Sequence, residues 1–280
     1  MRILIRILKK LSLLNSFNLM GYYPPDKTMK IPVIKSLGYD NFFEPEPWLV
    51  SLLRKILGSA SSQDYFIDVG VNVGQTLLKV KLVNRSISYF GFEPNPSCLF
   101  YLYELIRVND FQNVTIFPFA LSDSSGVIDL NLYTTNATDS TASIVQGFRR
   151  KSTNKIKVPV LNGREVLQLQ TIKIGVIKID VEGGELEVIN GMLSFIQRDR
   201  PLIICEILPV YNAGNVFRLT RQEQLEAILE SASYKIARID NCGGVAEINL
   251  IGVNSDIDLV NYLLFPEEKR ELLQRNMDLL

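Results

Sequence analysis

The stretch Tyr65-Phe-Ile-Asp-Val-Gly-Val-Asn-Val-Gly-Gln-Thr76 decides the fold class. Its apolar run stops at a turn that contains Gly70 and Gly74, and glycine lets a ligand lie against the backbone where a strand becomes a helix. A second apolar run ends at Glu93, 19 residues after Gly74, where doubly wound folds place a carboxylate that accepts hydrogen bonds from a ribose diol. The layout predicts a nucleotide-type cofactor site at the edge of an α/β sheet.

Asp68 and Asn72 separate this turn from a dinucleotide fingerprint, which has a further glycine to admit a pyrophosphate. The carboxylate of Asp68 would repel a pyrophosphate and attract a cationic amine. S-adenosylmethionine carries such an amine and no phosphate, so we expect it as the cofactor. Two other classes stay open: an NAD(P)-dependent oxidoreductase on a related sheet, and a catalytically silent module that keeps only the fold.

The composition indicates a globular protein without a net charge. The 280 residues are 47% hydrophobic, and 30 Lys and Arg balance 30 Asp and Glu, so no basic field suggests a nucleic-acid partner. The absence of histidine excludes an imidazole base and His-metal clusters. Three cysteines without a Cys-x-x-Cys spacing disfavour a zinc site and a disulfide framework. We therefore expect a cytoplasmic protein with reduced thiols.

The first 20 residues have a basic character. Their only charges are Arg2, Arg6, Lys9 and Lys10, and a basic amphipathic helix can contact a membrane surface. We expect instead a packed or frayed helix of a soluble protein, because one such helix binds lipid weakly. The segment is too short and too charged to cross a bilayer, and it lacks a signal-peptide cleavage site.

Alternating strand and helix patterns from residue 65 onward predict a doubly wound, mostly parallel α/β sheet of seven strands. The last two predicted strands, about 234 to 240 and 246 to 253, form a C-terminal antiparallel hairpin. The chain is divided into a helical or irregular extension over 1–63 that caps the site, a cofactor-binding domain over 64–255, and a helical tail over 256–280. A terminal hairpin beside a parallel sheet is an uncommon ending that disfavours a plain dinucleotide domain.

A second chemical motif is Val176-Ile-Lys-Ile-Asp-Val-Glu-Gly-Gly-Glu185. Asp180 and Glu182 follow a buried strand, so they are expected at the carboxyl edge of the sheet, where open α/β sheets bind ligands. Asp180 is the first candidate for a catalytic base, and Glu182 and Glu206 are the second. Each has a structural alternative: a helix cap for the first two, and a buried hydrogen-bonded acid for Glu206. The sequence does not demand a metal ion.

Several motifs in order resemble the FkbM-type methyltransferase family: Ile67 to Gly74, Phe92 to Pro96, Asn113 to Gly126, Lys178 to Gly183, and Pro201 to Glu206. The resemblance covers about residues 40 to 255. It implies a Rossmann-like class I fold and S-adenosylmethionine-dependent methylation, commonly of oxygen on sugars, glycans or polyketides. Val71 and Gly184 depart from the usual pattern.

The resemblance also implies site residues. Asp68, Gly70, Asn72 and Gly74 would hold the methionine part of the cofactor. Glu93 would bind the ribose with Asn95 nearby, Ala120 and Leu121 would lie along the adenine, and Asp180 would stand at the methyl-transfer site.

Residues 134–157 are expected to form a long connection. Its later part contains Arg149, Arg150, Lys151, Lys155 and Lys157 and no acid. One hypothesis is a lid that reads an anionic glycan substrate, carrying a phosphate or a carboxylate. The other is a solvated charged loop.

Overall fold

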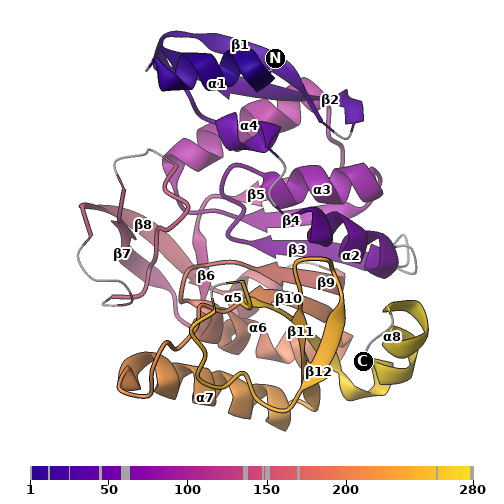
Figure 1. Ribbon diagram of the computed structural model, residues 1–280. Helices are drawn as coiled ribbons and strands as arrows, with labels where there is room; N and C mark the ends of the chain where they lie inside the picture. Colours follow the sequence, from indigo (N-terminus) through magenta and orange to yellow (C-terminus); the bar gives the residue numbers. More distant parts are fainter. Residues whose placement is uncertain are drawn as a thin grey trace.

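The computed structural model describes residues 2–11, 13–24, 26–43, 46–57, 64–134, 138–146, 148, 152–168, 171–256 and 258–277. Within these ranges the chain is built around an eight-stranded mixed sheet with helices on both faces (Figure 1). The strand order across the sheet is β12-β11-β13-β10-β9-β3-β4-β5. In chain order these strands are β3 Asp64–Val69, β4 Ser88–Phe92, β5 Val114–Phe117, β9 Lys173–Ile179, β10 Leu202–Glu206, β11 Tyr234–Ile239, β12 Val245–Ile248 and β13 Asn261–Pro266.

Parallel pairing joins the five strands from β10 to β5, and it brings their carboxyl ends to one edge of the sheet. Strand β13 is antiparallel to both of its neighbours, β10 and β11, and β12 pairs antiparallel with β11. The motifs around Gly70, Glu93 and Asp180 follow β3, β4 and β9, which are adjacent in the sheet. The topology thus brings three separated sequence motifs together.

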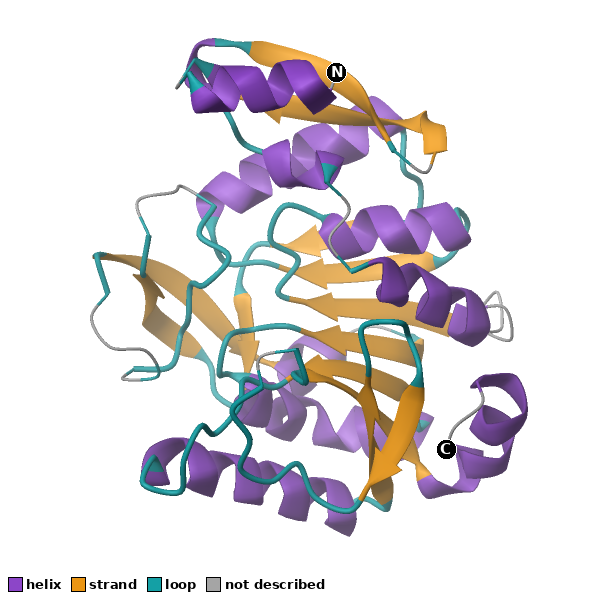
Figure 2. Ribbon diagram, in the orientation of Figure 1, coloured by secondary structure: helices purple, strands orange, loops and turns teal. Residues whose placement is uncertain are grey.

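Both faces of the sheet are buried, because successive side chains of a strand point to opposite faces. Phe66 belongs to one core cluster and Ile67 to the other. Helices α2, α3 and α4 contribute to the first cluster and α5, α6 and α7 to the second (Figure 2). Their bounds are α2 Pro47–Leu57, α3 Gln75–Val83, α4 Pro96–Asn109, α5 Gly163–Leu167, α6 Glu185–Asp199 and α7 Val216–Ser231.

The N-terminal region forms a unit of its own that packs on α4. It contains α1 Arg2–Lys10, the 3-10 turns Leu14–Ser16 and Tyr39–Phe42, and an antiparallel hairpin of β1 Asn18–Tyr23 and β2 Asp26–Ile34. The Tyr101 hydroxyl of α4 donates a hydrogen bond to the Pro32 carbonyl at 3.0 Å. The expectation of a helical or irregular extension missed this hairpin, because Pro32 weakens the strand pattern and is tolerated only at an edge position.

A second, three-stranded sheet stands beside the core, with the order β6-β8-β7 (Figure 1). Its strands are β6 Ala120–Ser122, β7 Gly126–Leu132 and β8 Asn154–Asn162. The long connection expected up to residue 157 is therefore shorter, because β8 begins at Asn154 and pairs along the whole of β7. Lys155 and Lys157, two of the proposed lid cations, form ion pairs with Asp129 on β7. Arg149, Arg150 and Lys151 lie outside the described residues.

The prediction of seven strands was wrong by one, since the main sheet has eight. Strand β13 lies inside the range that we expected to be a helical tail, and all six of its residues are buried. A strand buried on both faces lacks the alternation that identifies half-exposed strands. The described tail contains a helix only beyond it, α8 Arg270–Met277. The β11–β12 pair is antiparallel, and β12 ends at Ile248 rather than near residue 253.

Candidate functional site

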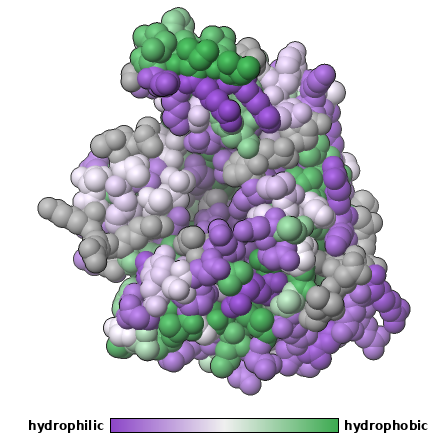
Figure 3. All heavy atoms as spheres, in the orientation of Figure 1, coloured by the Kyte–Doolittle hydropathy of each residue, from purple (hydrophilic) through white to green (hydrophobic). Residues whose placement is uncertain are grey.

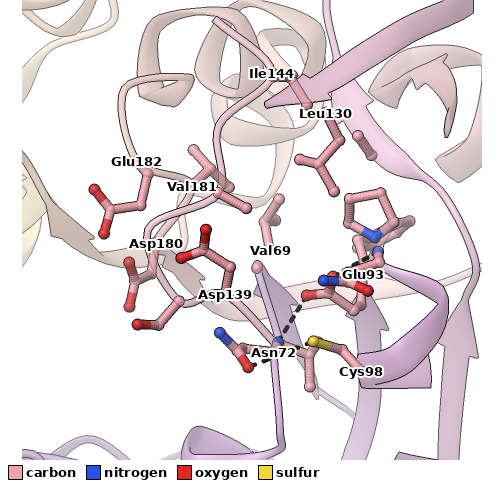
Figure 4. Close-up of a pocket in the computed structure, with 18 of the residues that line it drawn as sticks. Val69, Asn72, Glu93, Cys98, Leu130, Asp139, Ile144, Asp180, Val181 and Glu182 are labelled. Atoms are coloured by element: carbon pink, nitrogen blue, oxygen red, sulfur yellow. Dashed lines mark hydrogen bonds between the residues drawn. The ribbon is translucent and has the colours of Figure 1, made fainter. Parts of the chain in front are cut away.

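A pocket opens at the carboxyl edge of β3, β4 and β9. The space between its lining atoms, open solvent at the mouth included, is about 940 Å³, within the ~300–1,000 Å³ range of small-molecule sites. Figure 4 shows Asp139, Asp180 and Glu182 on one side of Val69 and Glu93 on the other. The lining residues are Glu46, Val69, Gly70, Val71, Asn72, Gln75, Thr76, Phe92, Glu93, Pro94, Asn95, Cys98, Ala120, Leu121, Leu130, Asp139, Ser140, Ala142, Ile144, Asp180, Val181 and Glu182.

Gly70 forms the floor, where the ends of β3 and β9 meet. Its φ angle is +90°, and a Cβ there would lie 1.9 Å from the Asp180 carbonyl oxygen. The Asp180 amide donates to the Val69 carbonyl at 3.0 Å, so the two strand ends are hydrogen-bonded where they touch. Only glycine fits this position, and the contact fixes where Asp180 leaves its strand.

Glu93 binds two loop backbones at the end of β4. One carboxylate oxygen accepts the Asn72 amide at 2.7 Å, and the other accepts the Asn95 amide at 2.8 Å. Burial raises the pKa of Glu93 to about 7, although both amide hydrogen bonds act to lower it. Asn95 also caps α4 by accepting the Ser97 amide at 3.0 Å. The carboxylate is thus held rigidly at the pocket wall.

A charge cluster surrounds the end of β9. The Lys178 ammonium is buried and lies 3.1 Å from an Asp180 carboxylate oxygen. Burial acts to lower the pKa of Lys178, but the carboxylates of Asp180, Glu46, Glu206 and Asp68 raise it overall. Repulsion from Asp180, followed by burial, raises the pKa of Glu206 to about 8. Lys178 therefore stays charged and holds Asp180 at the pocket.

Lys178, Lys79 and Glu46 were not predicted as site residues from the sequence. Lys178 stands within an apolar strand motif, and a lysine that interrupts such a run is the signal that was available. Glu46 comes from the N-terminal region, lines the pocket and pairs with buried Lys79 at 2.8 Å. No local motif surrounds Glu46, so only the fold reveals its place.

Asp139 was also missed, and it organises the loop over the pocket. One of its carboxylate oxygens accepts the amides of Tyr133 and Thr134 at 2.6 and 2.8 Å. The other accepts the Thr141 amide at 3.0 Å and the Thr141 hydroxyl at 2.7 Å. The available signal was the Asp-Ser-Thr sequence, which is typical of a side-chain-stabilised turn.

The structure brings most of the predicted site residues together. Eight of them line the pocket: Gly70, Asn72, Glu93, Asn95, Ala120, Leu121, Asp180 and Glu182. Asp68, Gly74 and Glu206 are not among the described lining residues.

Asp68 and Gly74 support the pocket from beneath. Asp68 is 1% exposed and accepts a hydrogen bond from the Tyr89 hydroxyl, and burial raises its pKa to about 6. This position corrects the expectation that Asp68 faces the ligand. Gly74 has a φ of +79° and begins α3, where a Cβ would meet Leu105 and Leu102. Its role is close packing of α3 against α4.

The pocket is lined by carboxyl groups, two of which pair with the buried Lys79 and Lys178 behind the wall. Among the described residues that line it, the carboxyl groups are Glu46, Glu93, Asp139, Asp180 and Glu182, and none is Lys or Arg. An apolar wall of Phe92, Leu121, Leu130 and Ile144 stands beside them. A ligand with a flat apolar part and a positive charge fits this combination, and a pyrophosphate does not.

A wider second cavity adjoins the pocket and shares Asn72, Gln75, Asp139 and Ser140 with it. Its remaining walls come from the N-terminal region and the end of β7. They contribute two basic side chains and two aromatic rings, Lys9, Lys35, Tyr39 and Phe43. A molecule in this cavity would reach the carboxylate side of the pocket.

We expect stability to fall as the pH rises from 5 to 8. Burial raises the pKa of Glu185, like that of Glu93, to about 7. In this range the unfolded chain has released protons that the folded chain still holds, so the free energy of unfolding decreases with pH. The decrease should be roughly 1 kcal/mol or more per carboxyl group. Urea unfolding at pH 5.5, 6.5, 7.5 and 8.5 measures it.

Glu185→Gln is the matched variant, because a glutamine oxygen can still accept the Gly183 amide that Glu185 accepts at 2.8 Å. This variant should still fold, and its free energy of unfolding should decrease less with pH than that of the wild type. A wild-type stability that rises over this range would contradict the assignment of raised pKa values.

A pocket at the carboxyl edge of a doubly wound sheet is where α/β proteins of this class bind nucleotide-type cofactors. The methyltransferase FkbM domain family matches residues 68–236. The chain therefore belongs to the FkbM methyltransferase family, and the resemblance seen in its motifs is confirmed.

Individual relatives give finer comparisons. Hexuronic acid methyltransferase AglP from Haloferax volcanii is 29% identical over 178 residues, which cover 62% of this chain and 68% of AglP. The crystal structure of methyltransferase FkbM from Methylobacillus flagellatus KT is 14% identical with a TM-score of 0.47. The match covers 93% of this chain and 59% of that one, so this chain spans less than two thirds of that protein. A putative caffeoyl-CoA O-methyltransferase from Staphylococcus aureus is 10% identical, with a TM-score of 0.45 and coverage of 93% and 91%.

Proposed function

We propose that this protein is an S-adenosylmethionine-dependent O-methyltransferase that acts on a sugar or glycan. The observation that carries the proposal is the pocket with five carboxyl groups and no basic side chain among its described lining residues. S-adenosylmethionine brings a sulfonium and an ammonium group, which such a pocket attracts. A nicotinamide dinucleotide brings a pyrophosphate, which it repels.

Several pocket residues support this cofactor. Gly70 lets the ends of β3 and β9 meet at the pocket floor, and the nearby Asn72 backbone is fixed by Glu93. Each Glu93 oxygen has lone-pair capacity beyond its one backbone bond, so the carboxylate can also accept a ribose hydroxyl. Ala120 and Leu121 provide apolar contact for the adenine beside Phe92. The methionine end then lies toward Asp180.

The bound cofactor supplies a methyl group activated by its positively charged sulfur. The protein aligns the acceptor oxygen with this group and excludes water, which accounts for most of the rate enhancement in a displacement of this kind. Asp180 accepts the proton of the attacking hydroxyl, and Lys178 holds it in place. Glu182 lines the same end of the pocket, whereas Glu206 lies behind Asp180 and acts through it.

The second cavity is our candidate acceptor site. Tyr39 and Phe43 lie in its wall with ring centroids 4.9 Å apart. The described lining of this cavity holds Lys9 and Lys35 beside Asp40 and Asp139, so its charges balance, and the two ammonium groups can pair with a carboxylate of an acceptor. Hexuronic acid is the substrate class in the name of the relative AglP. We therefore propose a uronic acid or a glycan that contains one as the acceptor.

We expect S-adenosylhomocysteine, and not NADH, to raise the melting temperature. Saturation at about 100 times the dissociation constant adds roughly 2.7 kcal/mol of stability. Glu93→Ala should weaken this binding about 100-fold, because it removes two charge-assisted hydrogen bonds that shape the ribose site. Isothermal titration calorimetry below the melting temperature of the variant measures the change.

Glu230→Ala, a replacement of an exposed glutamate on α7, is the control and should bind like the wild type. Stabilisation by NADH alone would overturn the cofactor assignment. If the protein binds S-adenosylhomocysteine but transfers no labelled methyl to glucuronosides, the cofactor assignment stands and the proposal of a uronic acid acceptor is wrong.

A further inference from the structure

The N-terminal unit exposes an unusual amount of apolar surface. Of the 17 large hydrophobic side chains that are exposed among the described residues, eight belong to the first 22 positions. They are Ile3, Leu4, Ile7, Leu11, Leu13, Phe17, Met20 and Tyr22. Figure 3 shows this apolar surface as a continuous cap at one end of the molecule, above a layer of hydrophilic residues. A contiguous patch of this kind marks an interaction surface.

Helix α1 turns only part of its apolar surface toward the protein, where Ile5 is fully buried and Leu8 packs against the core. Arg6 lies over the Phe43 ring at 4.8 Å, and Lys9 lies over the Tyr39 ring at 3.6 Å. These two cation–π contacts hold basic side chains toward the protein. Ile3, which is 76% exposed, and Ile7 face outward. The helix thus presents the rest of its apolar surface to the surroundings.

We propose that this apolar cap, the outer surface of α1 and β1, docks on the surface of a membrane with anionic lipids. Charge selects this partner, because described residues 2–24 include Arg2, Arg6, Lys9 and Lys10 and no Asp or Glu. Arg2 and Lys10, at the two ends of α1, are exposed and can reach lipid phosphates while the apolar side chains enter the headgroup layer. No helix in the described part of the chain can cross a bilayer, so the contact is peripheral.

The position of the cap gives the contact a consequence for the enzyme. Lys9, Leu14 and Asn15 line the second cavity, so that cavity opens directly beside the cap. A docked protein would hold its proposed acceptor site close to the membrane surface. The docking surface itself does not depend on the proposed function, since none of its outward side chains lines the cofactor pocket.

Flotation of the full chain with lipid vesicles tests the proposal. We expect binding to phosphatidylcholine vesicles that contain phosphatidylglycerol, weaker binding to phosphatidylcholine alone, and loss of binding at high salt. Ile3→Asp with Ile7→Asp should weaken binding roughly tenfold or more, because it removes the apolar part of the contact. Arg2→Glu with Lys10→Glu should weaken binding about fivefold or more for each charge.

The matched control is Val216→Asp with Leu250→Asp, which changes two side chains that are each 66% exposed and lie outside the cap. This control should bind vesicles like the wild type. All variants should keep the melting temperature and its shift with S-adenosylhomocysteine, which separates docking from folding and from cofactor binding. Absence of vesicle binding by the wild type, or equal loss in the control, would overturn the proposal. A wild-type dimer that Ile3→Asp with Ile7→Asp converts to a monomer, without vesicle binding, would assign the cap to a second copy instead.

Discussion

Gly70→Ala is expected to lower the free energy of unfolding by about 3 kcal/mol or more. The added methyl group would stand 1.9 Å from the Asp180 carbonyl oxygen, and backbone atoms cannot move aside as a flexible side chain can. The φ angle of +90° is itself strained for any residue with a Cβ. Because β3 and β9 are central strands, the strain cannot be relieved at an edge. Urea unfolding followed by circular dichroism measures the loss.

Gly126→Ala provides the control. A Cβ at Gly126 has no neighbour within 4 Å, and the backbone there does not have a positive φ. This variant should match the wild type within about 0.5 kcal/mol. If both variants had equal stability, the ends of β3 and β9 could not be in the tight contact described here.

Part of the candidate site could be predicted from local sequence patterns. The turn after β3, Glu93 and Asp180 were predictable because each lies at the end of a local apolar run with glycine or proline close by. Their convergence followed from a general rule, since parallel strands end at one edge of a sheet. Together, the local sequence pattern and this topological rule were sufficient to predict eight of the residues that line the pocket.

The missed parts depend on long-range packing. Strand β13 has no alternating pattern because it is buried on both faces between β10 and β11. Lys178 occupies an apolar strand, and its charge is stabilised first by Asp180 and then by the distant carboxylates of Glu46, Glu206 and Asp68. The position of Asp68 in the motif predicted that its carboxylate faces the ligand. The carboxylate instead accepts a hydrogen bond from the Tyr89 hydroxyl. Sequence spacing places a Cα at the site but does not fix the direction of the side chain.

The exposed face of α1 shows a similar limit. The spacing of apolar and basic residues predicted an amphipathic helix. The basic side chains lie over aromatic rings that are distant in the sequence, since Lys9 lies over Tyr39 and Arg6 over Phe43. The expectation of a packed helix holds for Ile5 and Leu8, but the sequence did not reveal that Ile3 and Ile7 stay exposed.

Asp180→Asn is expected to lower kcat for a hydroxyl acceptor by roughly 10²- to 10⁴-fold, the usual contribution of a positioned general base. Asparagine keeps the size and the contact with the β3 end but cannot take a proton. The chain has no histidine to replace the base. Binding of S-adenosylhomocysteine should change little, so the loss should appear in kcat. Transfer of labelled methyl to a glucuronoside, followed across pH 6 to 9, measures the effect.

The pH profile distinguishes a base from a merely structural carboxylate. If Asp180 takes the proton, the residual activity of Asp180→Asn should rise steeply with pH, because the acceptor must then ionise without help. Asp180→Glu should recover part of kcat, since it restores a carboxylate beside Lys178 at a slightly altered distance. An unchanged kcat in Asp180→Asn and also in Glu182→Gln would show that no carboxylate base is needed. That result would point to an acceptor oxygen that is already ionised, such as the carboxylate of the uronic acid itself, and it would move the site of methylation from a hydroxyl to that carboxylate.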